Sequence, residues 1–206
     1  MKKLLTLSMV SLLFVLSSCK SEAKKEETKP VIEVKKEAAF SVGKAKTDIV
    51  FTAYKTTEKV GVNGEFKEIN ITSGGDGDSV KEAINGAIFS IPIKSLATKD
   101  SSRDYKIKKF FFGVMASTQE LTGRLSLTDD TTGVAKLTMN GETKDIPFTY
   151  TIVDKTFNMQ AVIDVNTWNA GAALASLNEV CKVLHTGADG VSKTWSEVAL
   201  NITSTF

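Results

Sequence analysis

The sequence predicts an all-β fold, an antiparallel β-barrel of about eight strands with one or two short helices. Beyond Ala38, apolar and polar residues alternate with a period of two, which is typical of strands that bury one face. The connections between these segments are short, and short connections force neighbouring strands to be antiparallel. A long sheet with one apolar face must bury that face. Closing into a barrel does so and removes the exposed edges.

Eight segments are expected to form the strands. The five most regular are 121–128, 135–140, 146–152, 157–165 and 198–202. The three earlier candidates, less regular but rich in β-forming residues, are 49–54, 65–71 and 85–93. Pro92 should lie near a strand end or at an edge, because proline has no N–H to donate to a ladder.

The connections have turn-forming sequences. Asn140-Gly141 stands between two alternating segments and is the strongest hairpin signal in the chain. Residues 129–133 and 154–156 are expected to form similar turns. The predicted arrangement is therefore a meander.

Two stretches have helical rather than strand periodicity. Residues 103–114 follow Ser101-Ser102, which would cap the helix, and they place apolar residues at helical spacing. Residues 169–184 predict a second helix with Leu174, Leu177, Cys181 and Leu184 on one stripe.

The N-terminus predicts export. Residues 1–18 combine a basic start, an apolar run from Leu4 to Leu16 and small residues, which is typical of a signal peptide and too short to span a bilayer. Leu16-Ser17-Ser18-Cys19 resembles the lipobox of bacterial lipoproteins, which implies that Cys19 is lipidated. A plain secreted protein with a chance cysteine is the alternative. The expected location is the extracytoplasmic cell envelope, anchored to a membrane on its periplasmic or cell-surface face.

Residues 19–38 predict a flexible, charged tether. Residues 20–37 hold six lysines and five glutamates, with no aromatic residue to bury. Lys25-Glu26-Glu27 resembles the lysine-acid signal of some surface-exposed lipoproteins, and a solvated linker without an address is the other interpretation. Residues 39–206 then form one domain, which is long enough for a single core.

Charge and cysteine content exclude some functions. Removing residues 1–18 lowers the formal net charge from +2 to zero, which argues against a nucleic-acid partner. Cys181 is the only cysteine besides Cys19, so an internal disulfide would consume the thiol that is expected to be lipidated. No oligomeric state is predicted.

Several motifs, in order, resemble those of the YceI-like family. They are Val62-Asn63-Gly64-Glu65-Phe66, Ser95-Leu96-Ala97-Thr98, Arg103-Asp104, Lys108-Lys109-Phe110-Phe111, Leu121-Thr122-Gly123-Arg124-Leu125 and the turn Gly141-Glu142-Thr143-Lys144. The resemblance covers nearly all of residues 40–206. It implies a lipocalin-like barrel that holds a polyisoprenoid, a quinone or a similar lipid. Asn140, Glu142 and Asp145 depart from the aromatic, histidine and hydrophobic residues usual beside that turn.

The candidate site follows from the apolar inward face. A long apolar ligand would be lined by Phe51, Phe89, Phe110, Phe111, Leu125, Met139, Phe148, Phe157 and Met159. Arg103 and Asp104 are candidates for polar contacts at the barrel mouth, and a structural salt bridge is the alternative for this pair. Three consecutive aromatics at 110–112 cannot all face one core from a helix, because they sweep about 200° of arc. At least one is expected to reach a ligand channel, the mouth or a partner.

The sequence indicates a binding protein rather than an enzyme. His185 is the only histidine, so a His-rich zinc site is excluded. It lies at a predicted helix end, where a cation is favoured. No metal site, catalytic group or cofactor other than a bound lipid is expected. An eight-strand barrel can hold one small ligand or fill its interior with side chains. The alternative function is therefore an envelope module with a solid core that binds a protein or glycan.

Overall fold

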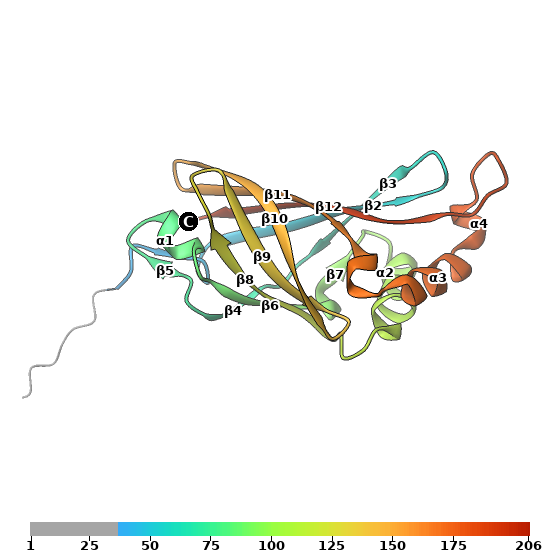
Figure 1. Cartoon of the computed structure of the whole chain (residues 1–206), viewed down its shortest axis with the longest axis horizontal. Helices are drawn as coiled ribbons and strands as arrows, with labels where there is room; N and C mark the ends of the chain where they lie inside the picture. The colour runs from blue at the N-terminus through green and yellow to red at the C-terminus, as the bar shows by residue number, and fades with distance from the viewer. Residues whose placement is uncertain (1–36) are drawn as a thin grey trace, which may run out of the picture. The chain divides into compact units, whose positions relative to one another are not determined.

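The computed structural model describes residues 37–206, so the predicted signal peptide, Cys19 and most of the tether lie outside the described residues. A curled antiparallel sheet of ten strands forms a half-barrel (Figure 1). The described residues contain this sheet and a separate two-stranded pair. Together their strands are β1 Phe40–Ser41, β2 Lys46–Lys55, β3 Val60–Phe66, β4 Asn70–Ser73, β5 Asp76–Gly77, β6 Ile88–Pro92, β7 Leu96–Ala97, β8 Glu120–Leu127, β9 Thr132–Met139, β10 Glu142–Val153, β11 Thr156–Asp164 and β12 Thr194–Thr205. The order in the sheet is β4-β6-β8-β9-β10-β11-β12-β2-β3-β7, while β1 and β5 pair separately.

The expected count of about eight strands is confirmed once two bends are recognised. The predicted strand 65–71 is bent at 67–69 into β3 and β4, and the strand 85–93 continues through a 3₁₀ turn into β7. β7 pairs with β3 and β6 pairs with β4, so these two bent segments join the two ends of the sheet. Lys67 N donates to Ser95 O (3.1 Å) at the bend. The bends let one continuous sheet curl around its apolar face.

The turn predictions agree with the structure at the β9–β10 hairpin. Met139 pairs with Glu142, which leaves Asn140 and Gly141 as a two-residue loop. Their φ angles are 52° and 74°, as a type I′ turn requires. Pro92 is the last residue of β6, as expected. Successive strands from β8 to β12 are antiparallel neighbours, which confirms the meander.

The helices gather at the two ends of the barrel (Figure 1). They are α1 Val80–Ile84, α2 Ser101–Phe110, α3 Gly171–Val180 and α4 Lys182–His185, with 3₁₀ turns η1 Ile93–Ser95, η2 Phe112–Val114 and η3 Val165–Trp168. α1 lies at one end, and α2 and α3 lie at the other. None of the helices within residues 37–206 is both long and apolar enough to cross a membrane.

Three details of the predicted helices were wrong. Asp100, rather than a serine, caps α2, because its carboxylate accepts a hydrogen bond from Arg103 N (3.0 Å). The predicted helix 169–184 begins at Gly171, after Asn169 in the left-handed region, and is interrupted at Cys181. Helix α1 was not predicted, although Ser79 at its N-cap accepts from Glu82 N (3.2 Å).

The end of the barrel that carries α1 is packed solid. Tyr150 lies between Phe148 and Phe157, with ring centroids 6.2 and 5.3 Å away, and its hydroxyl donates to Asp129 O (2.6 Å). Phe157 is 1% exposed, and α1 adds the buried Ala83 to the same core. Aromatic side chains therefore fill the interior at this end.

Candidate functional site

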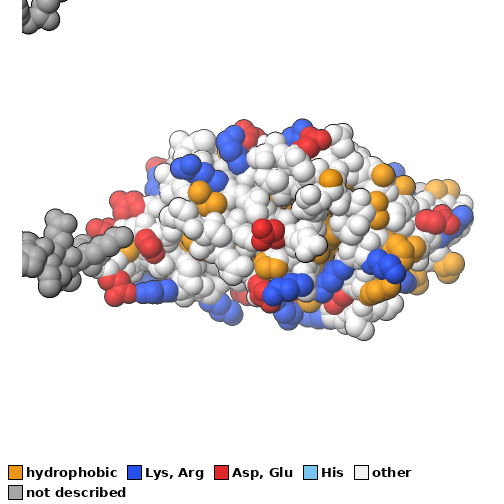
Figure 2. Space-filling view, turned by 90° about the horizontal axis from the view of Figure 1, so that it is seen from below, with side chains coloured by type: hydrophobic (Ala, Val, Ile, Leu, Met, Phe, Trp, Pro, Cys, Tyr) orange, Lys and Arg blue, Asp and Glu red, His pale blue; other side chains and the backbone are white. Residues whose placement is uncertain are grey.

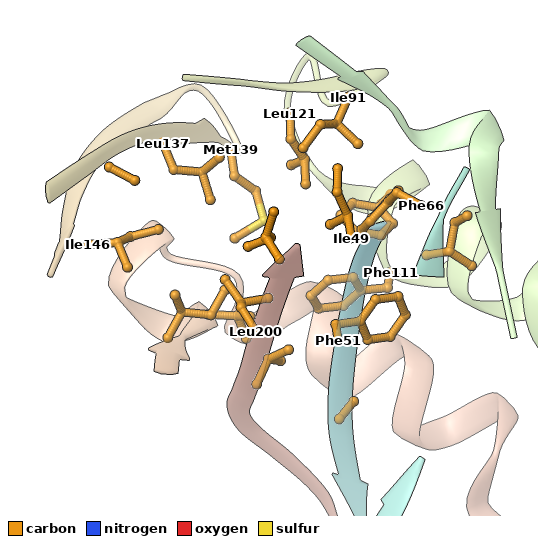
Figure 3. A pocket seen from close by; sticks show the side chains of 18 of the residues that line it. Ile49, Phe51, Phe66, Ile91, Phe111, Leu121, Leu137, Met139, Ile146 and Leu200 are labelled. Atoms are coloured by element: carbon orange, nitrogen blue, oxygen red, sulfur yellow. The ribbon is translucent and has the colours of Figure 1, made fainter. Parts of the chain in front are cut away.

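An apolar cavity of about 200 Å³ occupies the other part of the barrel. Figure 3 shows side chains from facing strands, including Phe51, Leu137 and Leu200, directed into one shared space. The lining residues are Ile49, Phe51, Ala53, Phe66, Ile69, Phe89, Ile91, Leu96, Ile107, Phe111, Phe112, Leu121, Leu125, Ala135, Leu137, Met139, Ile146, Met159, Ile163, Val165, Leu174, Leu177, Thr194, Trp195, Val198, Leu200 and Ile202. Thr194 supplies the only hydroxyl of this set, so the cavity is suited to a hydrocarbon chain.

Six of the nine lining residues proposed from the sequence do line this cavity. They are Phe51, Phe89, Phe111, Leu125, Met139 and Met159. Phe148 and Phe157 face inward, but they pack against Tyr150 at the solid end of the barrel. Phe110 lies outside the cavity, because α2 ends there and its ring packs edge-on against Tyr105. For Phe148 and Phe157, the prediction that the side chain faces inward was right, but neither lines the cavity. For Phe110, the predicted place in the lining was wrong.

The aromatic triplet divides as the helix ends. Phe111 is the C-cap of α2 and Phe112 begins the 3₁₀ turn η2, so both rings turn inward and line the cavity. Their ring centroids are 5.0 Å apart, and Phe112 also contacts Phe66 at 6.5 Å. The expectation that at least one of the three reaches a channel is confirmed as geometry. Two of them reach it because the helix changes pitch between them.

Three phenylalanines face glycines directly across the sheet. The register pairs Phe51 with Gly64, and a Cβ on that glycine would lie less than 3 Å from the ring. Phe89 is opposite Gly123 in the same way. A third such pair belongs to the packed end of the barrel. Because a strand glycine leaves space for a neighbouring ring, these pairs set how far the rings reach into the interior.

Sequence reasoning missed these glycines as determinants of the site. Gly123 was treated as one member of an alternating apolar face, although glycine inside a strand pattern indicates close approach of another group. Phe66, Phe112 and Trp195 were also not selected. Phe66 was visible in the Gly-x-Phe motif, but only the three-dimensional register shows that it faces Phe51, with ring centroids 5.7 Å apart.

Arg103 and Asp104 stabilise the start of α2. Asp104 accepts hydrogen bonds from Thr98 N (2.7 Å) and Thr98 Oγ1 (2.6 Å). Arg103 forms an ion pair with Asp100 at 3.5 Å, on the same first turn. Neither residue is part of the cavity lining. These contacts are structural, but they are not the salt bridge that was the alternative, because Asp104 binds Thr98 and Arg103 pairs within its own helix turn.

Polar groups gather where the cavity reaches the beginning of β12. A register shift between Thr194 and Val198 breaks the ladder with β2, and the Trp195 indole N–H donates to Thr56 O (2.7 Å). The Thr194 hydroxyl donates to Asn178 Oδ1 (2.8 Å) and lies 2.6 Å from Nδ1 of His185. Because Thr194 has one hydroxyl hydrogen, Nδ1 of His185 acts as the donor in that contact.

The charge of His185 differs from the sequence expectation. It does end helix α4, but burial of the ring, together with the charges of Lys55, Lys106 and Arg103, lowers its pKa to about 4. The imidazole is therefore neutral near pH 7 rather than a cation at a helix end. Burial also raises the pKa of the Cys181 thiol, so the thiol stays protonated.

The Asn140 departure has a structural role at this end of the barrel. Its Oδ1 accepts from Ala116 N (2.8 Å), and its Nδ2 donates to Trp168 O (2.8 Å). Trp168 is buried, and its indole N–H donates to Leu137 O (3.0 Å). The hairpin turn is thereby joined to η3 and to the loop before β8.

Within residues 37–206, no group of His, Cys, Asp and Glu side chains is arranged to hold a metal ion.

Comparison with known proteins identifies the family. The model of the YceI-like domain matches residues 40–206. The chain belongs to the YceI-like family. The matched region contains the whole half-barrel and its cavity. No curated protein matches the chain.

Two solved structures have the same fold. One is a polyisoprenoid binding domain from Saccharophagus degradans, implicated in plant cell wall breakdown, with a TM-score of 0.55 and 14% identity. It covers 81% of this chain and 97% of its own. The other is BcnA of Burkholderia cenocepacia, with a TM-score of 0.51, 19% identity, and coverage of 78% of this chain and 96% of its own. At these identities the likeness supports the fold.

Proposed function

We propose that this domain binds a long apolar ligand, a polyisoprenoid, quinone or similar lipid, and carries or sequesters it without catalysis. The apolar cavity is the observation that supports the proposal, since it offers hydrocarbon surface and almost no polar group. Each buried Å² of apolar surface would contribute about 25 cal/mol to binding. The polyisoprenoid binding domain among the structural neighbours supports the same ligand class.

The size of the cavity has a consequence for binding. A volume of about 200 Å³ is below the roughly 300–1,000 Å³ of ordinary small-molecule sites, so a long chain would require the lining to move. The lining of β12 and α3 is only half-buried, at Leu174, Leu177, Val198 and Leu200. The flexible side chains of Met139 on β9 and of Met159 on β11, which pairs with β12, also line the cavity. Ligand entry is therefore expected to widen the cavity on the β12 and α3 side.

Filling the cavity tests the proposal. Ala53 on β2 lines the cavity. Ala199 on β12 is paired with Thr52, the residue before Ala53, so it points to the other face of the sheet, where it belongs to an outer groove. Ala53→Phe is expected to occupy ligand space, and Ala199→Phe adds the same volume on the other face. Native mass spectrometry of the purified protein should show bound lipid in the parent chain and in Ala199→Phe, and about tenfold less in Ala53→Phe.

Recovery of the parent chain without lipid, together with no uptake of added isoprenoid, would contradict the proposal. Equal lipid content in the two alanine variants would show that a ligand binds outside the cavity. The alternative of a solid core has no support in a barrel that contains this cavity.

We further propose that a lipid on Cys19 anchors the domain to a membrane of the cell envelope. The support is the order of basic start, apolar run and Leu-Ser-Ser-Cys in residues 1–19. Labelled palmitate should be incorporated into the parent chain and not into Cys19→Ser, and the variant should leave the membrane fraction. Labelling of Cys19→Ser would contradict the anchor.

A further inference from the structure

Hydrophobic side chains are exposed at the last residue of α3, on α4 and in the loop that follows α4. Val183 is 89% exposed and Leu184 is 59% exposed, and Val180 and Val191 are also exposed. We call these four residues the α4 rim. Figure 2 shows hydrophobic side chains gathered at the end of the molecule that carries α3 and α4. Adjacent exposed valine and leucine on one short helix are unusual for a surface that faces only water.

The exposure of the rim follows from how α4 is held. Cys181, just before the helix, is buried, and His185 at its end contacts Thr194. These two contacts turn the same side of the segment inward, so Val183 and Leu184 between them face outward. Lys193 N donates to His185 O (3.0 Å), which holds the following loop beside the helix and keeps Val191 in the same segment.

The rim continues from the apolar cavity. Leu174 and Leu177 of α3 line the cavity, and α4 follows α3 directly. Thr194 and Trp195, at the other end of the α4 segment, line the cavity as well. The segment that carries the rim thus starts and ends at the cavity lining. The rim is therefore joined through the chain, on both sides, to residues of the cavity lining.

Lysines border the rim, and acids lie in the same region. Lys182 lies on α4 between the exposed residues, and Lys193 stacks on the Trp195 ring, with Nζ 3.6 Å from the ring centroid. Lys55 Nζ donates to Leu184 O (3.1 Å). The acids of the same region are Glu58, Glu179, Asp189 and Glu197. Glu197 pairs with Lys59 at 2.8 Å, and Asp189 accepts from Thr57 Oγ1 at 2.7 Å.

We infer that the α4 rim docks into the surface of an anionic lipid bilayer and places the cavity against the membrane. Exposed apolar residues beside lysines are the combination that binds lipid interfaces, with the apolar side chains entering the headgroup and acyl boundary and the lysines contacting anionic headgroups. The inference rests on the proposed function, because a carrier of a membrane-soluble ligand needs a water-free route between bilayer and cavity.

Position-specific quenching tests the docking. Val183→Trp places an indole on the rim, and Val153→Trp places one at the packed end of the barrel, where the valine is 61% exposed. Each full-length variant is mixed with vesicles of brominated phosphatidylcholine and phosphatidylglycerol in equal parts. Tryptophan emission at 183 should be quenched by the brominated acyl chains, while the emission at 153 should match the parent chain. An N-terminal anchor would bring both positions to the vesicle, so their difference isolates the rim.

Removing the apolar residues gives the second measurement. In a chain that also carries Cys19→Ser, and so has no acyl anchor, Val183→Ser with Leu184→Ser should lower vesicle binding and lipid transfer about tenfold or more. Val153→Ser with Val162→Ser, two valines that are each 61% exposed elsewhere on the barrel, is the matched control and should change neither. Quenching that was equal at 183 and 153, or absent at 183, would overturn the inference and leave the rim as a surface for a protein partner.

Two outcomes separate this inference from the proposed function. If the rim variant still carries lipid in native mass spectrometry and position 183 is not quenched, the docking inference fails while the proposed function stands. If position 183 is quenched and the parent chain never holds lipid, the proposed function fails while docking stands. If vesicles of brominated phosphatidylcholine alone quenched position 183 as strongly as the vesicles that contain phosphatidylglycerol, the role of the lysines would be overturned.

Discussion

The two ends of the barrel share one strand pattern and have opposite interiors. At the α1 end, Phe148, Tyr150 and Phe157 stack into a solid core. At the α2 and α3 end, inward side chains of the same strands surround a cavity of about 200 Å³. Alternation along a strand therefore decides which side chains face inward, whereas the reach of rings from neighbouring strands decides whether the interior is filled.

The largest expected effect is on the solid end. Phe157→Ala removes a ring that is 1% exposed and should lower the free energy of unfolding by about 3–5 kcal/mol. Leu200→Ala on the cavity side removes a half-buried side chain whose surroundings already include empty space, and it should cost about 1–2 kcal/mol. Urea unfolding of both variants measures the difference. Equal losses would mean that the two ends are equally well packed.

The glycine pairs sharpen the comparison at a smaller scale. At the solid end, Gly133 is opposite Phe148, and its added Cβ would also lie 2.7 Å from the Ser126 backbone oxygen. Gly133→Ala should therefore cost about 2–3 kcal/mol, because neither the packed ring nor the backbone can move away. At Gly64 the three atoms nearest to an added Cβ all belong to the ring of Phe51, and this ring borders the cavity into which it can turn.

We expect Gly64→Ala to cost about 1 kcal/mol or less and to reduce the space for ligand. Urea unfolding gives the first quantity and lipid content gives the second. A Gly64→Ala variant that was as destabilised as Gly133→Ala would show that Phe51 is held as rigidly as Phe148.

An effect of similar size is expected from the acid sensitivity of the helical end. In the folded protein the pKa of His185 is lowered to about 4, whereas in the unfolded chain it is near 6.5. The unfolded state therefore binds more protons between these pH values, and stability falls as the pH falls through that range.

Between pH 7 and pH 5 this loss should be about 1 kcal/mol, because the half-buried ring is partly screened by water. Urea unfolding at the two pH values measures it. In His185→Gln, this part of the difference in unfolding free energy between pH 7 and pH 5 should be absent. A variant with the same pH dependence as the parent chain would assign the acid sensitivity to other groups.

Local sequence signals predicted much of this protein. The alternating segments, the Asn140-Gly141 turn and the all-β class all appear in the structure, because each depends on neighbouring residues alone. The order of motifs in the sequence also identified the YceI-like family. The signals failed at the helix starts, where Ser101-Ser102 were predicted as the cap and the backbone geometry makes Asp100 the N-cap of α2.

The sequence by itself determined which side chains face the interior and that this interior is apolar. Only the tertiary structure decided where the interior is hollow, since that depends on the register that sets Phe51 against Gly64 and on the pitch change that turns Phe111 and Phe112 inward. It also decided that Val183 faces outward beside the cavity lining. Cavity volume and side-chain exposure depend on contacts between residues that are distant in the sequence, whereas the alternation of apolar and polar residues is a property of each strand segment alone.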